Sequence, residues 1–202
     1  MQAVYILDIK DIEKNYERIL KVLPLSATQK AAEYKDNSDK LRFLGGALLI
    51  ETFTSKSPLL YHKYGKPYKE TPPFFNISHS GDKVGIFLDD DGEVGFDIQR
   101  IKDYNATLTA RVFPEKELAV TTALNFAKFW TMKEGAAKLT GEGIVNPERQ
   151  VLTGIGDDAF VFGGKKVYYK TFIKGEYAVT ACAYNTINVK IYEITFNDLI
   201  NG

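Results

Sequence analysis

The order of helix-like and strand-like segments repeats along this chain, and the repeat limits the folds open to it. Residues 11–23 carry apolar side chains at helical spacing, and residues 74–98 hold strand-like runs whose last two are separated by the hairpin signal Asp89-Asp-Asp-Gly92. From residue 104 the pattern restarts, with helical segments followed by strands. This order predicts an α+β fold of two similar, pseudo-duplicated halves.

Hydrophobic spacing, caps and turn residues predict the individual elements. The expected helices are 11–23, about 26–34 with Ser26 as cap, one beginning at Ser38 or Asp39, 106–112, 115–124 and 126–139. The expected strands are 2–9, 74–78, 83–88, 93–98, 150–153, 159–162, 166–173, 177–184 and 188–194. The predicted halves are residues 1–102 and 103–202, and the cleft between them is the natural place for a ligand.

The charge balance excludes several function classes. Lys plus Arg and Asp plus Glu both total 26 in 202 residues, so no overall field favours nucleic acid or an anionic membrane. The single cysteine, Cys182, excludes an internal disulfide framework and a multi-cysteine zinc site. No apolar run approaches the roughly 18 residues of a membrane span, and the N-terminus is acidic where a signal peptide is basic. We expect a cytoplasmic protein.

One polar segment ends a predicted strand. Asn76-Ile-Ser-His-Ser-Gly81 offers an imidazole, two hydroxyls and a glycine that lets backbone approach a ligand. His79 and the hydroxyl of Ser78 or Ser80 can donate to phosphate oxygens. A merely structural strand end is the alternative. A Ser-His nucleophilic pair is disfavoured, because adjacent strand residues face opposite ways.

Two further segments carry oxygen ligands. In the strand 95–99, a period of two places Asp97 and Gln99 on one face, although a strand with one solvated face has the same pattern. On the helix 126–139, Glu134 and Lys138 are four residues apart and share a face. They suit a metal and a phosphate respectively, and a solvated surface ion pair is the alternative.

The fourth segment is a turn, in which Gly65 and Pro67 hold Lys66 in place. An ordinary exposed turn lysine would give the same sequence. Taken together, the four segments supply carboxylates for a hard cation, and lysine, histidine and serine side chains for phosphates. The combination favours metal-assisted phosphoryl-type chemistry.

Read in order, these segments resemble the signature of the Sfp-type 4′-phosphopantetheinyl transferases. The family pattern Y-G-K-P, F-N-I-S-H-S-G, G-x-D-I-x and W-x-x-K-E-x-x-x-K matches residues 64–67, 75–81, 95–99 and 130–138. Asp39-Lys-Leu-Arg42 and the segment 111–117 are similar to two further family motifs. The resemblance implies an enzyme that moves the phosphopantetheine arm of coenzyme A to a serine of an apo acyl or peptidyl carrier protein. Such an enzyme would release 3′,5′-ADP and would depend on Mg²⁺.

The resemblance also implies a role for each matching residue. The coenzyme A ligands would be Lys30, Arg42, Lys66, Ser78, His79 and Lys133, with Lys30 and Arg42 at the 3′-phosphate. The metal ligands would be Asp97, Gln99 and Glu134, and the catalytic residues Glu134 and Lys138. Glu134, or a metal-bound water that it orients, is the candidate base, and we expect the cation and lysines to hold its pKa low.

Two residues depart from the family pattern. Gln99 replaces the second carboxylate of the usual D-I-E, which predicts weaker metal affinity. Gly135 stands where a bulkier residue usually follows the Lys-Glu pair, although glycine costs about 1 kcal/mol in a helix interior.

Two alternatives to the transferase stay open. Gln99 is consistent with a coenzyme A or nucleotide-phosphate binder that has lost turnover. A structural protein would need four unrelated matches in the correct order. We expect a monomer, because a pseudo-duplicated chain can build a two-half site alone, with coenzyme A and an apo carrier protein as partners.

Overall fold

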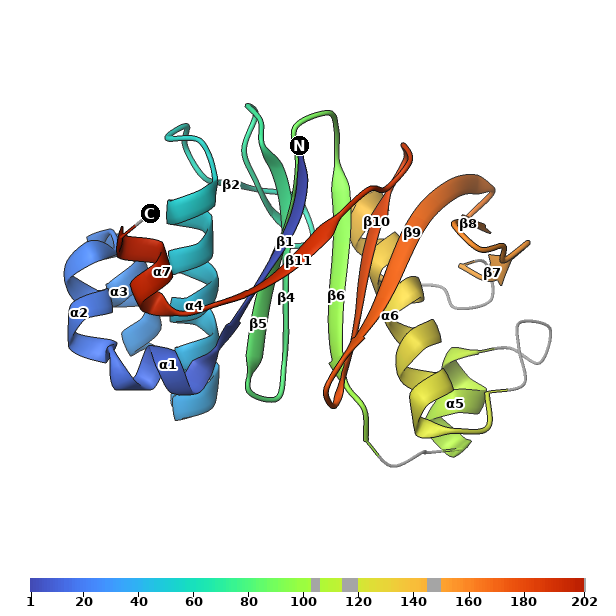
Figure 1. Ribbon diagram of the computed structural model, residues 1–202, viewed down its shortest axis with the longest axis horizontal. Helices are drawn as coiled ribbons and strands as arrows, with labels where there is room; N and C mark the ends of the chain where they lie inside the picture. The colour runs from blue at the N-terminus through green and yellow to red at the C-terminus, as the bar shows by residue number, and fades with distance from the viewer. Residues whose placement is uncertain (103–105, 114–119, 145–149, 202) are drawn as a thin grey trace.

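The computed structural model describes residues 1–102, 106–113, 120–144 and 150–201. The chain forms two β-sheets side by side, with helices on the outer flank of each (Figure 1). The α+β class predicted from the sequence is confirmed. Every helix among the described residues is too short or too polar to cross a lipid bilayer.

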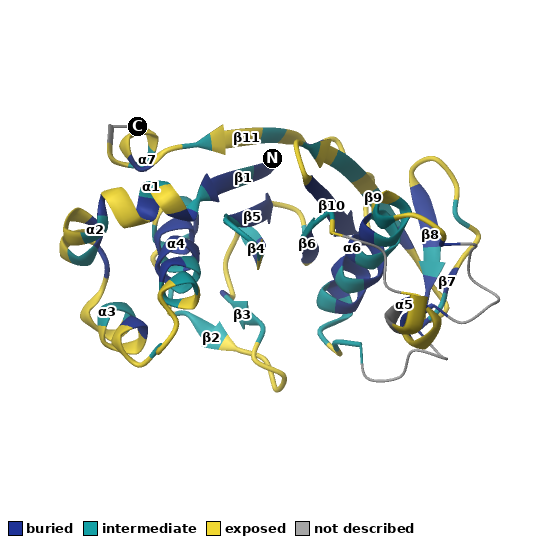
Figure 2. Ribbon diagram, turned by 90° about the horizontal axis from the view of Figure 1, so that it is seen from below, coloured by how far each residue is buried: buried dark blue, intermediate teal, exposed yellow. Residues whose placement is uncertain are grey.

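The first sheet has the strand order β11-β1-β5-β4. Its strands are β1 (Gln2–Asp8), β4 (Phe74–Ser80), β5 (Lys83–Asp89) and β11 (Lys190–Ile194). The helices beside it are α1 (Ile9–Lys14), α2 (Tyr16–Val22), α3 (Leu25–Ala32), α4 (Asn37–Phe53) and α7 (Phe196–Asn201). Buried Leu44, Leu48 and Ile86 belong to one core between α4 and the sheet, while α3 is largely exposed (Figure 2).

The second sheet has the strand order β6-β10-β9-β8-β7. Its strands are β6 (Val94–Arg100), β7 (Leu152–Thr153), β8 (Ala159–Phe162), β9 (Lys165–Lys174) and β10 (Tyr177–Ala183). The helices α5 (Ala106–Val112) and α6 (Ala123–Thr140) lie beside it, and α6 packs on β6 and β10. A separate two-stranded sheet joins β2 (Leu60–Tyr61) to β3 (Pro67–Tyr68).

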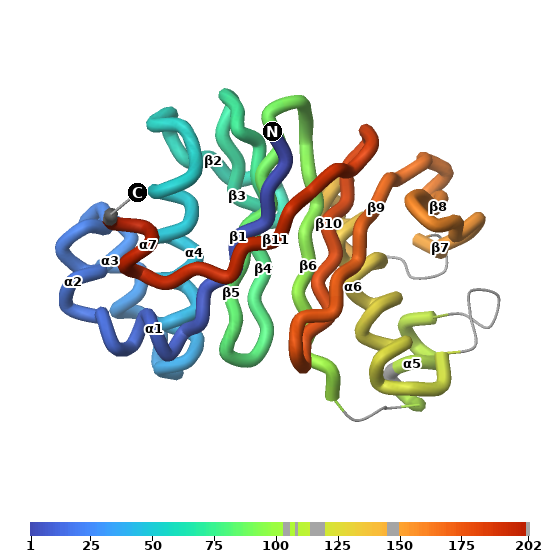
Figure 3. Tube along the Cα trace, in the orientation of Figure 1, coloured from blue at the N-terminus to red at the C-terminus, as the bar shows by residue number. Residues whose placement is uncertain are grey.

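Two strands tie the N-terminal and C-terminal parts of the chain together. β6 comes before residue 102 in the sequence but pairs antiparallel with β10, so that Asp97 lies opposite Thr180. β11 comes from the C-terminal part but pairs parallel with β1 (Figure 3). Buried Phe196 of α7 then packs into the core of the first sheet, beneath the guanidinium of Arg18. The two parts therefore interlock.

The helix boundaries differ from the prediction in three places. The segment 11–23 divides into α1 and α2 at Asn15, whose side chain donates to the carbonyl of Asp11 instead of facing solvent. The predicted caps are wrong, because Pro24 precedes α3 and the carboxylate of Asp36 caps α4. Residues 115–119 of the predicted helix 115–124 lie outside the described residues, and α6 begins only at Ala123.

Candidate active site

Three side chains of β4 bridge the boundary between the two sheets. β4 is the edge of the first sheet and β6 is the edge of the second. Alternate residues of a strand point to the same side, and here each makes one bond to β6. The bonds are Phe96 N to Asn76 Oδ1 (2.9 Å), Ser78 Oγ to Asp97 Oδ1 (2.7 Å) and Arg100 N to Ser80 Oγ (3.0 Å). Side chains thus join the sheets where their edges meet.

Asp97 lies at the centre of a buried polar cluster at this boundary. Its Oδ1 accepts from Ser78 and from Lys138, whose Nζ is 2.6 Å away. Lys138 also donates to Ser78 Oγ at 2.9 Å. Asp97 is 5% exposed, and its Oδ2 has no hydrogen-bond partner among the described residues. A buried carboxylate oxygen without a partner is costly, and a bound cation would satisfy it.

Glu134 adds a second carboxylate to this cluster. Burial raises the pKa of Glu134, the negative charge of Asp97 raises it further, and Lys138 opposes both. Without a cation, burial and the like charge of Asp97 outweigh the lysine, and the expectation that the cation and lysines hold this pKa low stays a prediction. The predicted proximity of Glu134, Asp97 and Lys138 agrees with these interactions.

Gln99 lies two residues after Asp97 on β6. Phe96 and Ile98 belong to the buried core on the opposite face, as the period of two predicts. The side-chain amide of Gln99 donates to the carbonyl of Arg100 at 3.0 Å. Among the described residues no group of three or more His, Cys, Asp or Glu side chains is placed to hold a metal ion. The predicted metal-ligand set of Asp97, Gln99 and Glu134 therefore stays a prediction.

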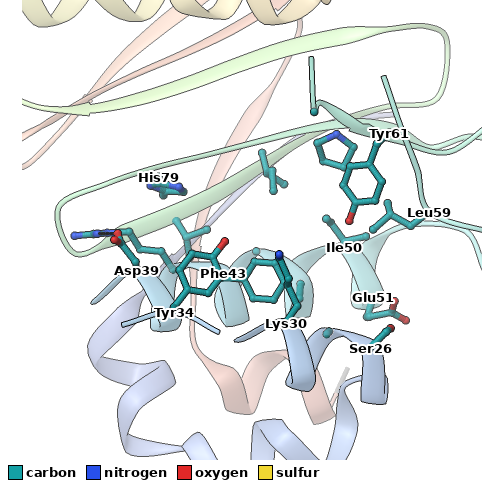
Figure 4. A pocket seen from close by; sticks show the side chains of 18 of the residues that line it. Ser26, Lys30, Tyr34, Asp39, Phe43, Ile50, Glu51, Leu59, Tyr61 and His79 are labelled. Atoms are coloured by element: carbon teal, nitrogen blue, oxygen red, sulfur yellow. Dashed lines mark hydrogen bonds and ion pairs between the residues drawn. The ribbon is translucent and has the colours of Figure 1, made fainter. Parts of the chain in front are cut away.

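A pocket of about 650 Å³ opens beside this cluster, between α3, α4, β4 and the β2-β3 turn. Polar residues including Arg42, Ser78 and His79 line it together with apolar residues of α4. Figure 4 shows His79 and Asp39 at one end, and Leu59 and Tyr61 at the other. Ser78 belongs both to the pocket wall and to the Asp97 cluster, so it connects the two.

Positive groups lie at the polar end of the pocket. Arg42 is held in place, because its Nε donates to the carbonyl of Gly81 (2.9 Å) and its Nη1 to Asp39 Oδ1 (2.6 Å). Lys30 is exposed and pairs with Glu33 at 2.7 Å. Desolvation within the pocket lowers the pKa of His79, and the charges of Arg42 and Lys138 lower it further. This end can receive an anion, which would favour the protonated imidazole.

The other two predicted lysine ligands lie elsewhere. Lys66 donates to Glu93 Oε2 (2.8 Å) and to the carbonyl of Val94 (3.2 Å), at the start of β6. Lys133 is fully buried, donates to the carbonyl of Val112 at 2.7 Å, and lies over the ring of Phe113. Five residues on a helix turn through roughly 500°, which leaves Lys133 about 140° from Lys138. The helical period would have predicted this separation.

Sequence reasoning missed the role of Asn76 and Ser80 as bridges between the sheets. The available signal was the alternation of polar residues at 76, 78 and 80 within the strand. It also missed the aromatic walls of the pocket, Tyr34 and Tyr61. These residues gave no signal, because Tyr34 after α3 and Tyr61 on β2 line one pocket with β4 residues only in the folded chain.

Three relatives among known proteins share the name 4′-phosphopantetheinyl transferase. No protein-family model matches the chain. The 4′-phosphopantetheinyl transferase AcpT of Salmonella typhi is 34% identical over 148 residues, which cover 62% of this chain and 74% of the relative. AcpT of Escherichia coli O157:H7 is 38% identical over 112 residues, covering 50% and 57%. The 4′-phosphopantetheinyl transferase psf-1 of Bacillus pumilus is 32% identical over 155 residues, covering 68% and 66%.

The chain thus spans between 57% and 74% of the length of these relatives. The motif order predicted the same family, and the structure brings Ser78, Asp97 and Lys138 of three separate motifs into hydrogen-bond contact. The chain belongs to the Sfp-type 4′-phosphopantetheinyl transferase family.

Proposed function

We propose that this protein transfers the 4′-phosphopantetheine moiety of coenzyme A to a serine of an apo carrier protein and releases 3′,5′-ADP. The observation that carries the proposal is the position of Ser78. This residue lines the pocket and bonds to Asp97 and Lys138, so the pocket and the carboxylate cluster adjoin at Ser78. The names of the relatives support the same activity.

The pocket is the proposed coenzyme A site. Arg42, His79 and Lys30 would neutralise the phosphates of the nucleotide, with Arg42 best placed because two bonds fix its guanidinium. The apolar residues of α4 would contact the base. Lys66 and Lys133 remain proposed ligands only through conformational change, since their described contacts direct them to Glu93 and Val112.

Asp97 and Glu134 are the proposed Mg²⁺ ligands, with the amide oxygen of Gln99 as a neutral third. The unpartnered Oδ2 of buried Asp97 fits this assignment, because oxygen ligands of this kind suit a hard cation. When bound, Mg²⁺ would neutralise charge on the pyrophosphate.

The transfer requires one bond to form and one to break. The carrier serine oxygen bonds to the β-phosphorus of coenzyme A, and the bond from that phosphorus to the bridging oxygen breaks. The serine proton passes to Glu134, or to a water that Glu134 orients, and the 3′,5′-ADP leaves with the electron pair. Lys138 stabilises the charge that develops on the leaving pyrophosphate oxygen.

The proposed arrangement is a monomer of two similar halves, residues 1–102 and 103–202, with coenzyme A in the cleft between them. Residues of the first half line the pocket, and α6 of the second half adds Glu134 and Lys138 to the cluster beside it, which supports a site shared by the two halves. The proposed partner is an acyl or peptidyl carrier of fatty acid, polyketide or peptide synthesis in the cytoplasm.

The test is to incubate the protein with coenzyme A, Mg²⁺ and a panel of apo carrier proteins, and to measure intact carrier mass. We expect one carrier to gain the mass of a single phosphopantetheine group. A carrier variant without the acceptor serine is the control. If the protein binds coenzyme A by calorimetry but modifies no carrier, the alternative suggested by Gln99, a binding protein without turnover, replaces the proposal.

A further inference from the structure

Helix α6 lies very close to the second sheet at Gly95 of β6. A Cβ added at Gly95 would lie 1.9 Å from the carbonyl oxygen of Gly135 and 2.7 Å from the backbone nitrogen of Leu139. No residue but glycine fits here, so the helix backbone rests directly on the strand backbone. Any side chain at this point would lift α6 from the sheet.

Gly135 itself rests on Cys182. A Cβ added at Gly135 would lie 3.0 Å from Cys182 Sγ, which is tighter than an ordinary van der Waals contact. Cys182 lies directly opposite Gly95 across the β6-β10 pair and is fully buried, so its sulfur has little room to move. Gly95, Gly135 and Cys182 therefore form one contact, which we call the glycine seat.

We propose that the glycine seat is a positioning element that sets the distance of Glu134 and Lys138 from Asp97. The inference rests on the proposed function, since it assigns these three residues to one site. Asp97 follows Gly95 by two residues on the face that meets α6. Glu134 directly precedes Gly135, and Lys138 directly precedes Leu139. The contact and the polar groups thus share the same strand and the same helical turns.

The short hydrogen bonds of the cluster make it sensitive to the distance between α6 and the second sheet. The bonds from Lys138 to Asp97 (2.6 Å) and to Ser78 (2.9 Å) weaken as α6 lifts away. The Oδ2 of Asp97 has no hydrogen-bond partner among the described residues, so it can accept a further group. Mg²⁺ demands near-ideal octahedral geometry, so a shift of a few tenths of an ångström between two carboxylates lowers its affinity.

The seat also accounts for a glycine that the helix itself disfavours. Alanine normally stabilises a helix interior relative to glycine. At position 135 of this chain, the buried thiol of Cys182 occupies the space that a methyl group needs. Gly135 and Cys182 are therefore a matched pair, and a smaller residue at 182 should permit a larger one at 135.

The experiment is a double-variant cycle in which residue 135 is Gly or Ala and residue 182 is Cys, Ser or Ala. Carrier modification gives kcat and the KM for coenzyme A, and calorimetry gives Mg²⁺ affinity without substrate. Thermal unfolding checks that each variant folds. Gly92→Ala is the matched control, because a Cβ at Gly92 meets nothing within 4 Å.

We expect Gly135→Ala alone to lower kcat about tenfold and to weaken Mg²⁺ binding several-fold, while the KM for coenzyme A changes less than about twofold. The pocket does not involve α6, so KM is the internal reference. Gly135→Ala/Cys182→Ala should recover kcat to within about twofold of Cys182→Ala alone, and Gly135→Ala/Cys182→Ser should lie between.

The proposal is overturned if Gly135→Ala keeps the parental kcat and Mg²⁺ affinity. It is also overturned if kcat in the Gly135→Ala background does not increase as the residue at 182 changes from Cys to Ser to Ala. If Gly135→Ala alone does not fold, its combinations with Cys182→Ser and Cys182→Ala still give this order. A parent protein that modifies no carrier would refute the proposed function instead, and the Mg²⁺ titrations would then still test the seat.

Discussion

The pocket and the carboxylate cluster adjoin at Ser78, and they differ in how far their side chains are already positioned for a ligand. On the pocket side, Arg42 is already fixed by Gly81 and Asp39, and His79 lines the same wall. On the α6 side, Lys138 and Asp97 bind each other at 2.6 Å, and only Asp97 Oδ2 is left without a described partner. The pocket thus holds a guanidinium that is already fixed, whereas the carboxylate cluster is partly closed by its own lysine and, under the proposed function, would rearrange to bind a cation and a pyrophosphate.

Asp97→Asn should have the largest effect. It keeps the shape of the side chain but removes the charge that Lys138 and the proposed cation share. We expect kcat to fall on the order of 10³-fold, which corresponds to about 4 kcal/mol of transition-state stabilisation. Coenzyme A affinity, measured by calorimetry, should change little because Asp97 is not part of the pocket wall. Equal losses in kcat and affinity would show that the two sides act as one site.

Arg42→Ala should weaken coenzyme A binding in the pocket and leave the carboxylate cluster unchanged. Loss of a charge-assisted contact to phosphate costs about 2 kcal/mol, so the KM for coenzyme A should rise roughly 30-fold with little change in kcat. Dephospho-coenzyme A, which lacks the 3′-phosphate, is the matched control substrate. If the variant impairs both substrates equally, the assignment of Arg42 to the 3′-phosphate is wrong.

Lys133→Met should distinguish the role of Lys133 from that of Lys138, the other α6 lysine predicted to act in the site. Lys133 is fully buried on the carbonyl of Val112, so its loss should lower the free energy of unfolding by about 2 kcal/mol. The KM for coenzyme A should stay within about twofold of the parent value. Chemical denaturation and steady-state kinetics measure the two effects. A large rise in KM with unchanged stability would restore Lys133 to the coenzyme site.

Gln99→Glu should strengthen Mg²⁺ binding at the carboxylate cluster. A third carboxylate adds a charged oxygen ligand, and we expect the Mg²⁺ concentration for half-maximal activity to fall about fivefold. Gln99→Met is the control without a ligand oxygen. A glutamate variant that needs as much Mg²⁺ as the parent would exclude residue 99 from the metal site.

The smallest expected effect is the pH dependence of coenzyme A affinity, which arises because His79 takes up a proton when the coenzyme binds. Desolvation and the charges of Arg42 and Lys138 lower its pKa, so the free imidazole is neutral at pH 7. A phosphate beside it would raise that pKa, so coenzyme A affinity should increase as pH falls through the bound-state pKa and level off below the free-state value. The expected change is about threefold. Calorimetry in buffers of different ionisation enthalpy counts the protons, and His79→Gln should remove the His79 contribution.

The sequence predicted most strands and the polar face of β6, because a period of two is a local property. It could not predict that β6 pairs with β10 and β11 with β1, since both pairings join distant segments. The strands β2 and β3 lie on either side of the predicted turn at Lys66 and were not predicted, because each has only two residues. Turn residues there gave no strand signal.

The candidate site was predicted unevenly for a related reason. Asp97, Glu134 and Lys138 follow from strand and helix periods, and the structure brings them together. The burial of Lys133 depends on α5, and the need for Gly135 depends on Cys182 of another strand. Such contacts exist only once the helix rests on the sheet.

The central claim is that a nucleotide in the pocket and a cation on Asp97 meet at Ser78. Crystals grown with coenzyme A and Mn²⁺, a stand-in for Mg²⁺ with an anomalous signal, test it most directly. We predict the metal on Asp97 Oδ2 and Glu134, with a phosphate of the coenzyme beside Arg42 and His79. A metal bound away from Asp97, or a nucleotide outside the pocket, would contradict the account.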